Sequence, residues 1–150
     1  GVNADILGAA ITTAMAQRLV RRLCPDCREA QPITGKDAKI LEPLFKNIPH
    51  AEDLPKNRDT MWVPKGCLKC GGLGYKGRIA VVEVILMDKE IEDCVRHTSS
   101  ERDIWKAAMH QRIRRMAQDG AVKVLLGVTS LDELSRVVDL TDEVMLGSIV

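Results

Sequence analysis

The sequence predicts an α+β fold that is mostly α, in which a small β element and a four-cysteine knuckle site pack beside a helical bundle. Three observations support this prediction. Two Cys-x-x-Cys pairs flank a proline-containing segment, one apolar run at 78–87 is rich in β-branched residues, and nearly everything after Asp88 has helical patterning. A chain of 150 residues is long enough for one domain or two small ones.

Composition excludes several classes of function. Apolar residues make up 45% of the chain and charged residues 29%, which is ordinary for a soluble globular protein. A net charge of +1 gives no strong field for nucleic acid or acidic lipid, and 3% aromatic residues argue against a base-stacking surface. The chain shows neither a signal-peptide pattern nor an apolar run of about 18 residues, the length of a membrane span.

The first expected element is a helix over residues 5–23. Five apolar residues recur near one face at helical spacing, namely Leu7, Ile11, Met15, Leu19 and Leu23. Pro25 ends the pattern, and the arginines at 18, 21 and 22 are interpreted as a solvated helix end. Because so apolar a helix opens the chain, we expect a fragment that continues from missing upstream structure over 1–23, and a possible homodimer that covers the apolar face.

Residues 24–75 form the next expected unit, a cysteine-containing subdomain with an insertion at 28–64. The insertion holds Pro32, Pro43, Pro49 and Pro55, so it predicts little regular structure. A short helix is expected near 36–46, a polar loop at 49–59 and a short strand at 60–63, where Trp62 and Val63 favour extended backbone.

The remaining unit, 76–140, combines one strand with a helical subdomain. The run at 78–87 is expected to be a strand, with Glu83 facing outward or lying at an edge. Helices are expected at 89–97, from Ser100 onward, at 113–126 with a break near Gly120, and from Ser130 to Val138, where Ser130 and Glu133 have capping-box spacing. The tail at 141–150 is weakly patterned.

The two cysteine pairs are the strongest chemical signal. Cys24 and Cys27 form one pair, Cys67 and Cys70 the other, and each two-residue spacing lets both sulfurs reach one ion. Together they predict a structural Zn²⁺ site whose four thiolates leave no open position for catalysis. Gly71 and Gly72 suit a positive φ next to the ligands. Nearby basic residues are expected to offset the site's formal charge of about −2, namely Arg21, Arg22, Arg28, Lys65 and Lys69.

Other interpretations of the cysteines remain open at this point. A rubredoxin-like iron site uses the same ligand pattern, a redox CxxC needs a βαβ context, and residues 67–74 fit one repeat of a DnaJ-type chaperone motif. Cys94 is interpreted as a small buried apolar residue. The three histidines, at positions 50, 97 and 110, are interpreted as ordinary surface or satisfied residues.

Catalytic motifs are not found in the sequence. It contains no Ser/His/Asp grouping, no paired-carboxylate motif and no G-x-x-x-x-G-K-[ST] phosphate loop. We therefore assign no catalytic and no nucleotide-binding residue.

Three blocks, taken in order, resemble the C-terminal region of the type II secretion and type IV pilus assembly ATPases, the family of general secretion pathway protein E and PilB. They are AQRLVRRLCPDC at 16–27, KGCLKCGGLGYKGRIAVVEVI at 65–85 and QDGAVKVLLGVTSLDELSRVV at 118–138. The resemblance covers about residues 4–140. It implies that Cys24, Cys27, Cys67 and Cys70 match the family's zinc ligands.

The resemblance also implies a cytoplasmic hexameric ATPase that works at the inner-membrane face and moves a membrane platform protein. ATP and Mg²⁺ would bind only in a missing upstream domain, so this chain is expected to be inactive alone and to support the hexamer and partner contacts. Nucleic acid is not an expected partner. The alternatives are a standalone zinc-ribbon module that binds protein or nucleic acid and, more weakly, a redox protein that uses the cysteine pairs.

Overall fold

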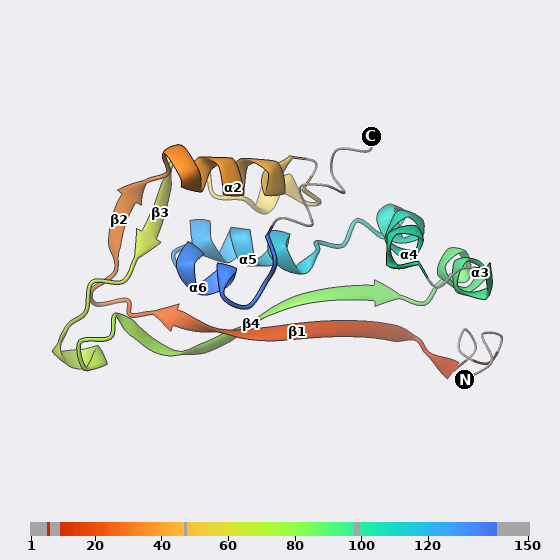
Figure 1. Cartoon of the computed structure of the whole chain (residues 1–150), viewed down its shortest axis with the longest axis horizontal. Coiled ribbons are helices and arrows are strands. Elements are labelled where there is room, and N and C mark those ends of the chain that lie inside the picture. The colour runs from red at the N-terminus through yellow and green to blue at the C-terminus, as the bar shows by residue number, and fades with distance from the viewer. Residues whose placement is uncertain (1–5, 7–9, 47, 98–99, 141–150) are drawn as a thin grey trace.

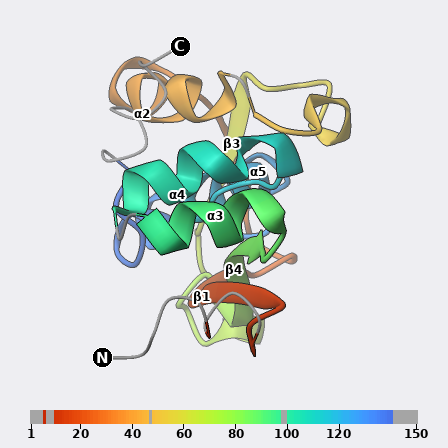
Figure 2. The same ribbon diagram turned by 90° about the vertical axis from the view of Figure 1, so that its right-hand side faces the viewer.

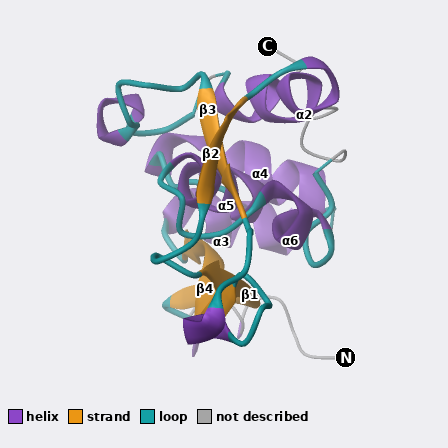
Figure 3. Cartoon of the chain, turned by 90° about the vertical axis from the view of Figure 1, so that its left-hand side faces the viewer, coloured by secondary structure: helices purple, strands orange, loops and turns teal. Residues whose placement is uncertain are grey.

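The computed structural model describes residues 6, 10–46, 48–97 and 100–140. Figure 1 shows three layers: a long two-stranded ribbon, a middle layer that contains α5 and α6, and helix α2 on the far side. The ribbon pairs β1 (Thr13–Leu23) with β4 (Tyr75–Leu86) in antiparallel register. A second antiparallel pair, β2 (Glu29–Pro32) with β3 (Thr60–Val63), runs from the ribbon toward α2 at one end (Figure 3).

Five α-helices lie in the described part of the chain. They are α2 (Gly35–Phe45), α3 (Lys89–His97), α4 (Glu101–Ala108), α5 (Met116–Leu125) and α6 (Leu131–Ser135). Three short 3₁₀ turns accompany them, η1 (Ala51–Asp53), η2 (Leu68–Cys70) and η3 (Met109–Gln111). Helices α3 and α4 pack together (Figure 2) and lie at the opposite end of the molecule from β2 and β3 (Figure 1). None of the described helices has the length and apolar character needed to cross a bilayer.

One core joins the three layers. Val20 and Val81 from the ribbon meet Leu41 from α2 and Leu134 from α6 in a single buried cluster. Helix α5 lies between them, because it contributes Ala117, Ala121 and Val124 to the same cluster and contacts β4, β3, α2 and α6. Residues from the predicted insertion at 28–64 are therefore part of the central core.

The helix expected over 5–23 is wrong for residues 13–23, which form strand β1. The segment is rich in helix formers, but β4 offers it a partner of β-branched residues, and cross-strand pairing overrides local propensity. The register shifts between Arg21 and Leu23, so Val20 and Leu23 are both buried although they lie three positions apart. The arginines therefore do not form a helix end.

Most of the other expected elements are confirmed. The helix near 36–46 is α2, with Pro43 inside it, the strand at 60–63 is β3, and the run at 78–87 is most of β4. The helices at 89–97 and after Ser100 are α3 and α4. The expected loop at 49–59 contains η1, and strand β2 was not expected. The tail at 141–150 lies outside the described residues.

Two helix boundaries differ from the expectation. Helix α5 begins at Met116 instead of residue 113, because its N-cap residue Arg115 has an extended backbone with φ −72° and ψ 164°, and it continues unbroken through Gly120. Helix α6 ends at Ser135 instead of Val138. Ser130 does accept a hydrogen bond from the backbone N–H of Glu133, but the Glu133 carboxylate bonds to Arg21 instead of returning to Ser130.

Candidate metal centre

The four predicted ligand cysteines come together at one end of the ribbon. Cys24 and Cys27 follow soon after β1, while Cys67 is the N-cap and Cys70 the last residue of turn η2, shortly before β4. The ligand atoms of all four lie within 4.8 Å of one another. The pairing of β1 with β4 assembles the site, because it brings both cysteine turns to the same end of the ribbon (Figure 1, lower left). These turns are the first knuckle, around residues 24–27, and the second knuckle, around residues 67–74.

The spacing of the sulfur atoms fits tetrahedral coordination of a single metal ion. The Sγ atoms of Cys24 and Cys67 are 4.0 Å apart, and Cys70 Sγ is 3.8 Å from both Cys27 Sγ and Cys67 Sγ. Four sulfurs at about 2.3 Å from a central Zn²⁺ would lie about 3.8 Å from one another. The donor set and its spacing are therefore compatible with a four-thiolate metal site.

Backbone groups prepare one sulfur for the thiolate form. The N–H groups of Cys67 and Gly74 each donate to Cys70 Sγ at 3.2 Å. The hydrogen bond from Cys67, followed by that from Gly74, lowers the pKa of Cys70 to about 6. Burial has the opposite effect on Cys27 and raises the pKa of its thiol to about 12.

Glycines in the second knuckle allow this geometry. Gly71 and Gly72 have φ of 63° and 80°, as the sequence predicts, although their own N–H groups bond to backbone carbonyls of Leu68 and Cys67. Gly74 has φ 76°, and its carbonyl accepts from the Cys24 N–H at 2.9 Å, so it joins the two knuckles. A Cβ at Gly74 would lie 2.5 Å from Pro64 Cβ, so only glycine fits there.

Two of the basic residues near the site, Lys65 and Lys69, have acidic partners beside the cysteines. Lys69 pairs with Asp26 at 2.5 Å, and Lys65 pairs with Glu29, so each ion pair links the second knuckle to the chain around the first. Arg28 instead lies over the Trp62 ring, 4.5 Å from its centroid, and donates to the Gly127 carbonyl. The two lysines are thus the predicted basic residues whose ion pairs border the cysteines.

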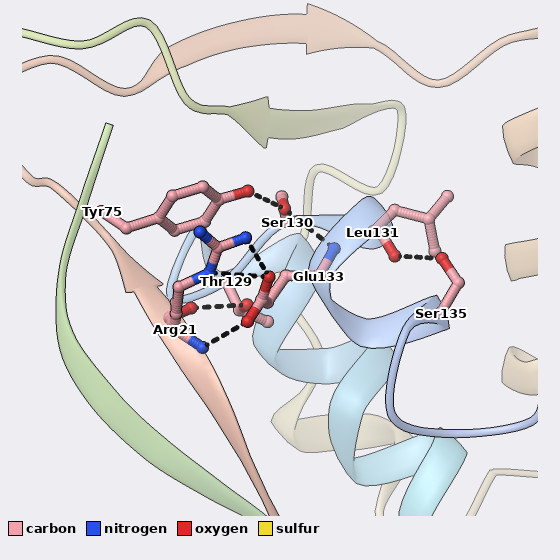
Figure 4. Close-up of polar contacts among 7 residues, drawn as sticks. All are labelled: Arg21, Tyr75, Thr129, Ser130, Leu131, Glu133 and Ser135. Atoms are coloured by element: carbon pink, nitrogen blue, oxygen red, sulfur yellow. Dashed lines mark hydrogen bonds and ion pairs between the residues drawn. The ribbon is translucent and has the colours of Figure 1, made fainter. Parts of the chain in front are cut away.

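A polar network fixes the end of β1 just before Cys24 (Figure 4). Arg21 donates from Nε at 2.9 Å and from Nη2 at 2.6 Å to Oε2 of Glu133, and its backbone N–H donates to Oε1. These hydrogen bonds hold the pKa of the Glu133 carboxyl below its usual range. Thr129 Oγ1 donates to the Arg21 carbonyl at 2.9 Å, so both the N–H and the carbonyl of Arg21 are hydrogen-bonded to this region.

The same network includes the first residue of β4. Tyr75 lies under the Arg21 guanidinium, 4.3 Å from ring centroid to Cζ, and its hydroxyl is 2.7 Å from Ser130 Oγ (Figure 4). Helix α6 therefore contacts both strands where they enter the cysteine cluster. The sequence offers no signal for this pairing, because Arg21 and Glu133 are 112 positions apart and ordinary in type.

The structure also brings together a second group of potential metal ligands that the sequence did not predict. Asp88, Glu90 and His110 have ligand atoms within 4.8 Å of one another at the other end of the ribbon. His110 is satisfied by hydrogen bonds, as expected, but its carboxylate neighbours were not foreseen. Cys94 is a free, half-buried thiol on α3.

Comparison with known proteins gives a consistent set of matches. A family model described as type II/IV secretion system protein matches residues 1–136. The chain is 34% identical over 137 residues to type II secretion system protein E of Aeromonas hydrophila, covering 91% of this chain and 25% of that protein. It is 33% identical over 141 residues to the type IV pilus assembly ATPase PilB of Thermus thermophilus, covering 93% of this chain and 15% of that protein.

A third relative is the type IV pilus assembly ATPase TfpB of Acinetobacter baylyi, 35% identical over 141 residues, covering 94% of this chain and 23% of that protein. The chain thus spans a quarter or less of the length of these relatives.

Proposed function

The chain belongs to the type II/IV secretion system protein family, and from that membership we propose that it is the C-terminal zinc-binding and helical part of a secretion or pilus assembly ATPase. The family match over residues 1–136, which includes all four clustered cysteines, is the observation that carries the proposal. The part has a structural role in a hexameric motor and performs no chemistry of its own.

Zn²⁺ is the proposed resident ion. Cys24, Cys27, Cys67 and Cys70 hold it as four thiolates, and the sulfur separations of 3.8–4.0 Å support a closed tetrahedral site. Such a site cannot activate water, because no coordination position is left open. Its effect is to fix the end of β1 to the start of β4, so zinc binding contributes to the folding free energy of the knuckle end.

Nucleotide chemistry belongs, in this proposal, to a part of the protein outside these 150 residues. The sequence contains no G-x-x-x-x-G-K-[ST] loop, so ATP and Mg²⁺ would bind elsewhere. The whole protein would act in the cytoplasm at the face of the inner membrane, as a hexamer that contacts a membrane platform protein. The names of the relatives include both type II secretion and type IV pilus assembly, and they support the two systems equally.

Native mass spectrometry and thiol titration test the zinc assignment. We expect about one zinc ion per chain, and we expect four of the five cysteines to react only after a chelator is added. Cys27→Ser should lose the ion, whereas Cys94→Ser, a matched control outside the cluster, should retain it. An iron mass, or full thiol reactivity without chelator, would contradict the assignment.

An ATPase assay tests the division of labour. We expect no ATP turnover from the purified 150-residue chain, with or without zinc. Turnover that remains after further purification and is lost when a residue of this chain is substituted would contradict the proposal. It would mean that a nucleotide site lies within these 150 residues.

A further inference from the structure

A second group of metal-ligand side chains lies at the end of the ribbon far from the cysteines. Asp88 follows β4, Glu90 lies in the first turn of α3, and His110 lies in η3 after α4. Their ligand atoms lie within 4.8 Å of one another. The side chains are 31%, 65% and 48% exposed, respectively, so water and ions can reach them.

The imidazole of His110 is oriented by a group outside the cluster. Its Nδ1 lies 2.7 Å from the carbonyl oxygen of Ala107, and because a carbonyl only accepts, Nδ1 carries the hydrogen. Nε2 is thereby directed at the two carboxylates, 2.8 Å from Asp88 Oδ2 and 4.0 Å from Glu90 Oε2. Metal-binding histidines commonly donate their other ring nitrogen to a carbonyl in this way.

A neutral imidazole held like this presents a lone pair on Nε2 to a carboxylate oxygen. The two lone pairs repel each other unless a cation lies between them. A proton on Nε2 meets this need at the observed separation of 2.8 Å. A divalent ion meets the same need after a small opening, because two ligands at about 2.0 Å in tetrahedral geometry lie about 3.3 Å apart.

Asp88 is also positioned by its neighbours. Its Oδ1 accepts from the Ile91 N–H at 3.1 Å, which caps the start of α3, and its Oδ2 accepts from Gln111 Nε2 at 2.5 Å. Gln111 in turn exchanges two hydrogen bonds with the backbone of Leu86 in β4. The carboxylate therefore already has the outer hydrogen bonds that orient a ligand before an ion arrives.

We propose that Asp88, Glu90 and His110 form a second, solvent-accessible site for a first-row divalent cation, separate from the four-cysteine centre. One imidazole nitrogen and two carboxylate oxygens are a ligand set that suits Zn²⁺ or Mn²⁺, with water in the remaining positions. The ion replaces the Nε2 proton and links the end of β4 and the start of α3 to the turn η3.

The test is a Mn²⁺ titration of the zinc-loaded protein followed in amide NMR spectra. Mn²⁺ prefers oxygen and nitrogen ligands, so it should leave the thiolates alone and broaden resonances near the second site. We expect the amides of Ile91 and Gln111 to broaden before those around Cys67. A calorimetric titration with Zn²⁺ should then detect one further equivalent per chain.

Two ligand variants and one matched control make the test specific. His110→Gln should abolish the localised broadening and the extra Zn²⁺ equivalent, and Glu90→Gln should weaken binding by about tenfold or more. Glu92→Gln removes the same charge from the same helix, but its carboxylate is directed toward Arg96, so binding should be unchanged. Asp88 is left intact because it caps α3.

Folding of each variant is checked by the unaffected part of its amide spectrum. Broadening spread evenly over exposed acids, or unchanged binding of both ions in a folded His110→Gln protein, would overturn the proposal.

Discussion

Glu133 is the residue on which the polar contacts between β1 and α6 converge. Its side chain is almost fully buried, accepts three hydrogen bonds from Arg21, and lies beside strand residues that lead directly into the cysteine cluster. The buried carboxylate stabilises the fold because both of its oxygens accept hydrogen bonds from Arg21. Removing its charge leaves Arg21 with a weaker acceptor.

Glu133→Gln should therefore lower the free energy of unfolding by about 1–2 kcal/mol at neutral pH. The folded-state pKa of Glu133 is lowered, so its stabilisation is fully present above the ordinary glutamate pKa of about 4.3 and is lost as pH falls through the folded-state value. Urea unfolding of both proteins, with equal zinc content, should show a difference that shrinks from pH 7 toward pH 3.

Asp132→Asn is the control for this measurement. It removes a charge at the neighbouring, exposed position, and it should change stability by no more than about 0.5 kcal/mol. A difference between the wild-type and Glu133→Gln proteins that stays constant across the pH range would show that the ion pair with Arg21 is not its source.

At the scale of elements, helix α5 and strand β4 satisfy each other's backbone groups. Glu83 on β4 accepts from the Met116 N–H at 3.2 Å, at the start of α5. Asp119 on α5 accepts in return from the Val82 N–H at 2.9 Å. Glu83 therefore caps a helix instead of simply facing outward, and part of the free edge of β4 is protected from pairing with another strand.

Gly120 of α5 lies directly against the Leu134 side chain of α6. A Cβ there would lie 2.3 Å from Cδ1 and 2.8 Å from Cδ2 of Leu134, whose side chain is fully buried in the core. Gly120→Ala should therefore destabilise the protein by about 1–3 kcal/mol, although alanine is the better helix former. Thermal or urea unfolding measures the loss.

A double-mutant cycle identifies the cause of that loss. In a Leu134→Ala background, itself weaker by about 2–5 kcal/mol, the clash is gone and Gly120→Ala should become neutral or mildly stabilising. Equal costs of Gly120→Ala in both backgrounds would mean that the glycine is needed for a reason other than this contact.

The elements that sequence patterns predict well are those with strong local signals. β-branched residues and bounding glycines mark β4, and the serine at 130 marks the start of α6. Strand β1 could not be predicted, because its residues favour a helix and its strand form depends on pairing with residues about 50–75 positions away. The cysteine cluster was predictable from spacing, whereas the group around His110 depends wholly on tertiary packing.

For the whole molecule, the face of the ribbon turned away from α5 carries exposed apolar side chains. Met15 lies opposite Val84 and Leu19 opposite Ala80, and the two β1 side chains are 64% and 54% exposed. Because side chains alternate along a strand, these residues share one face. Apolar residues grouped on a surface in this way promote association.

We therefore expect the 150-residue chain to self-associate through the ribbon as its concentration rises. Leu19→Lys should shift sedimentation-velocity profiles toward the monomer, since a charge on this face disfavours its burial. Leu126→Lys instead changes an exposed leucine at the C-cap of α5, and it should leave association unchanged. A wild-type chain that stays monomeric at the highest attainable concentration would contradict this prediction.

The position of the cysteine cluster at the open end of the ribbon has a consequence for sequence variation. Strand β1 ends at Leu23 and β4 begins at Tyr75. The hydrogen bond from Cys24 to Gly74 joins the two ends of the segment between them. Because the ends of this segment are held together, doubling the length of a flexible loop within it costs only about 0.6 kcal/mol. Within the intervening segment, α2 is held by the core and Leu54 is buried with Ile48 and Val122, whereas residues 56–59 are all polar and exposed. That stretch is where homologous chains can lengthen, shorten or acquire new recognition sequences without disturbing the ribbon.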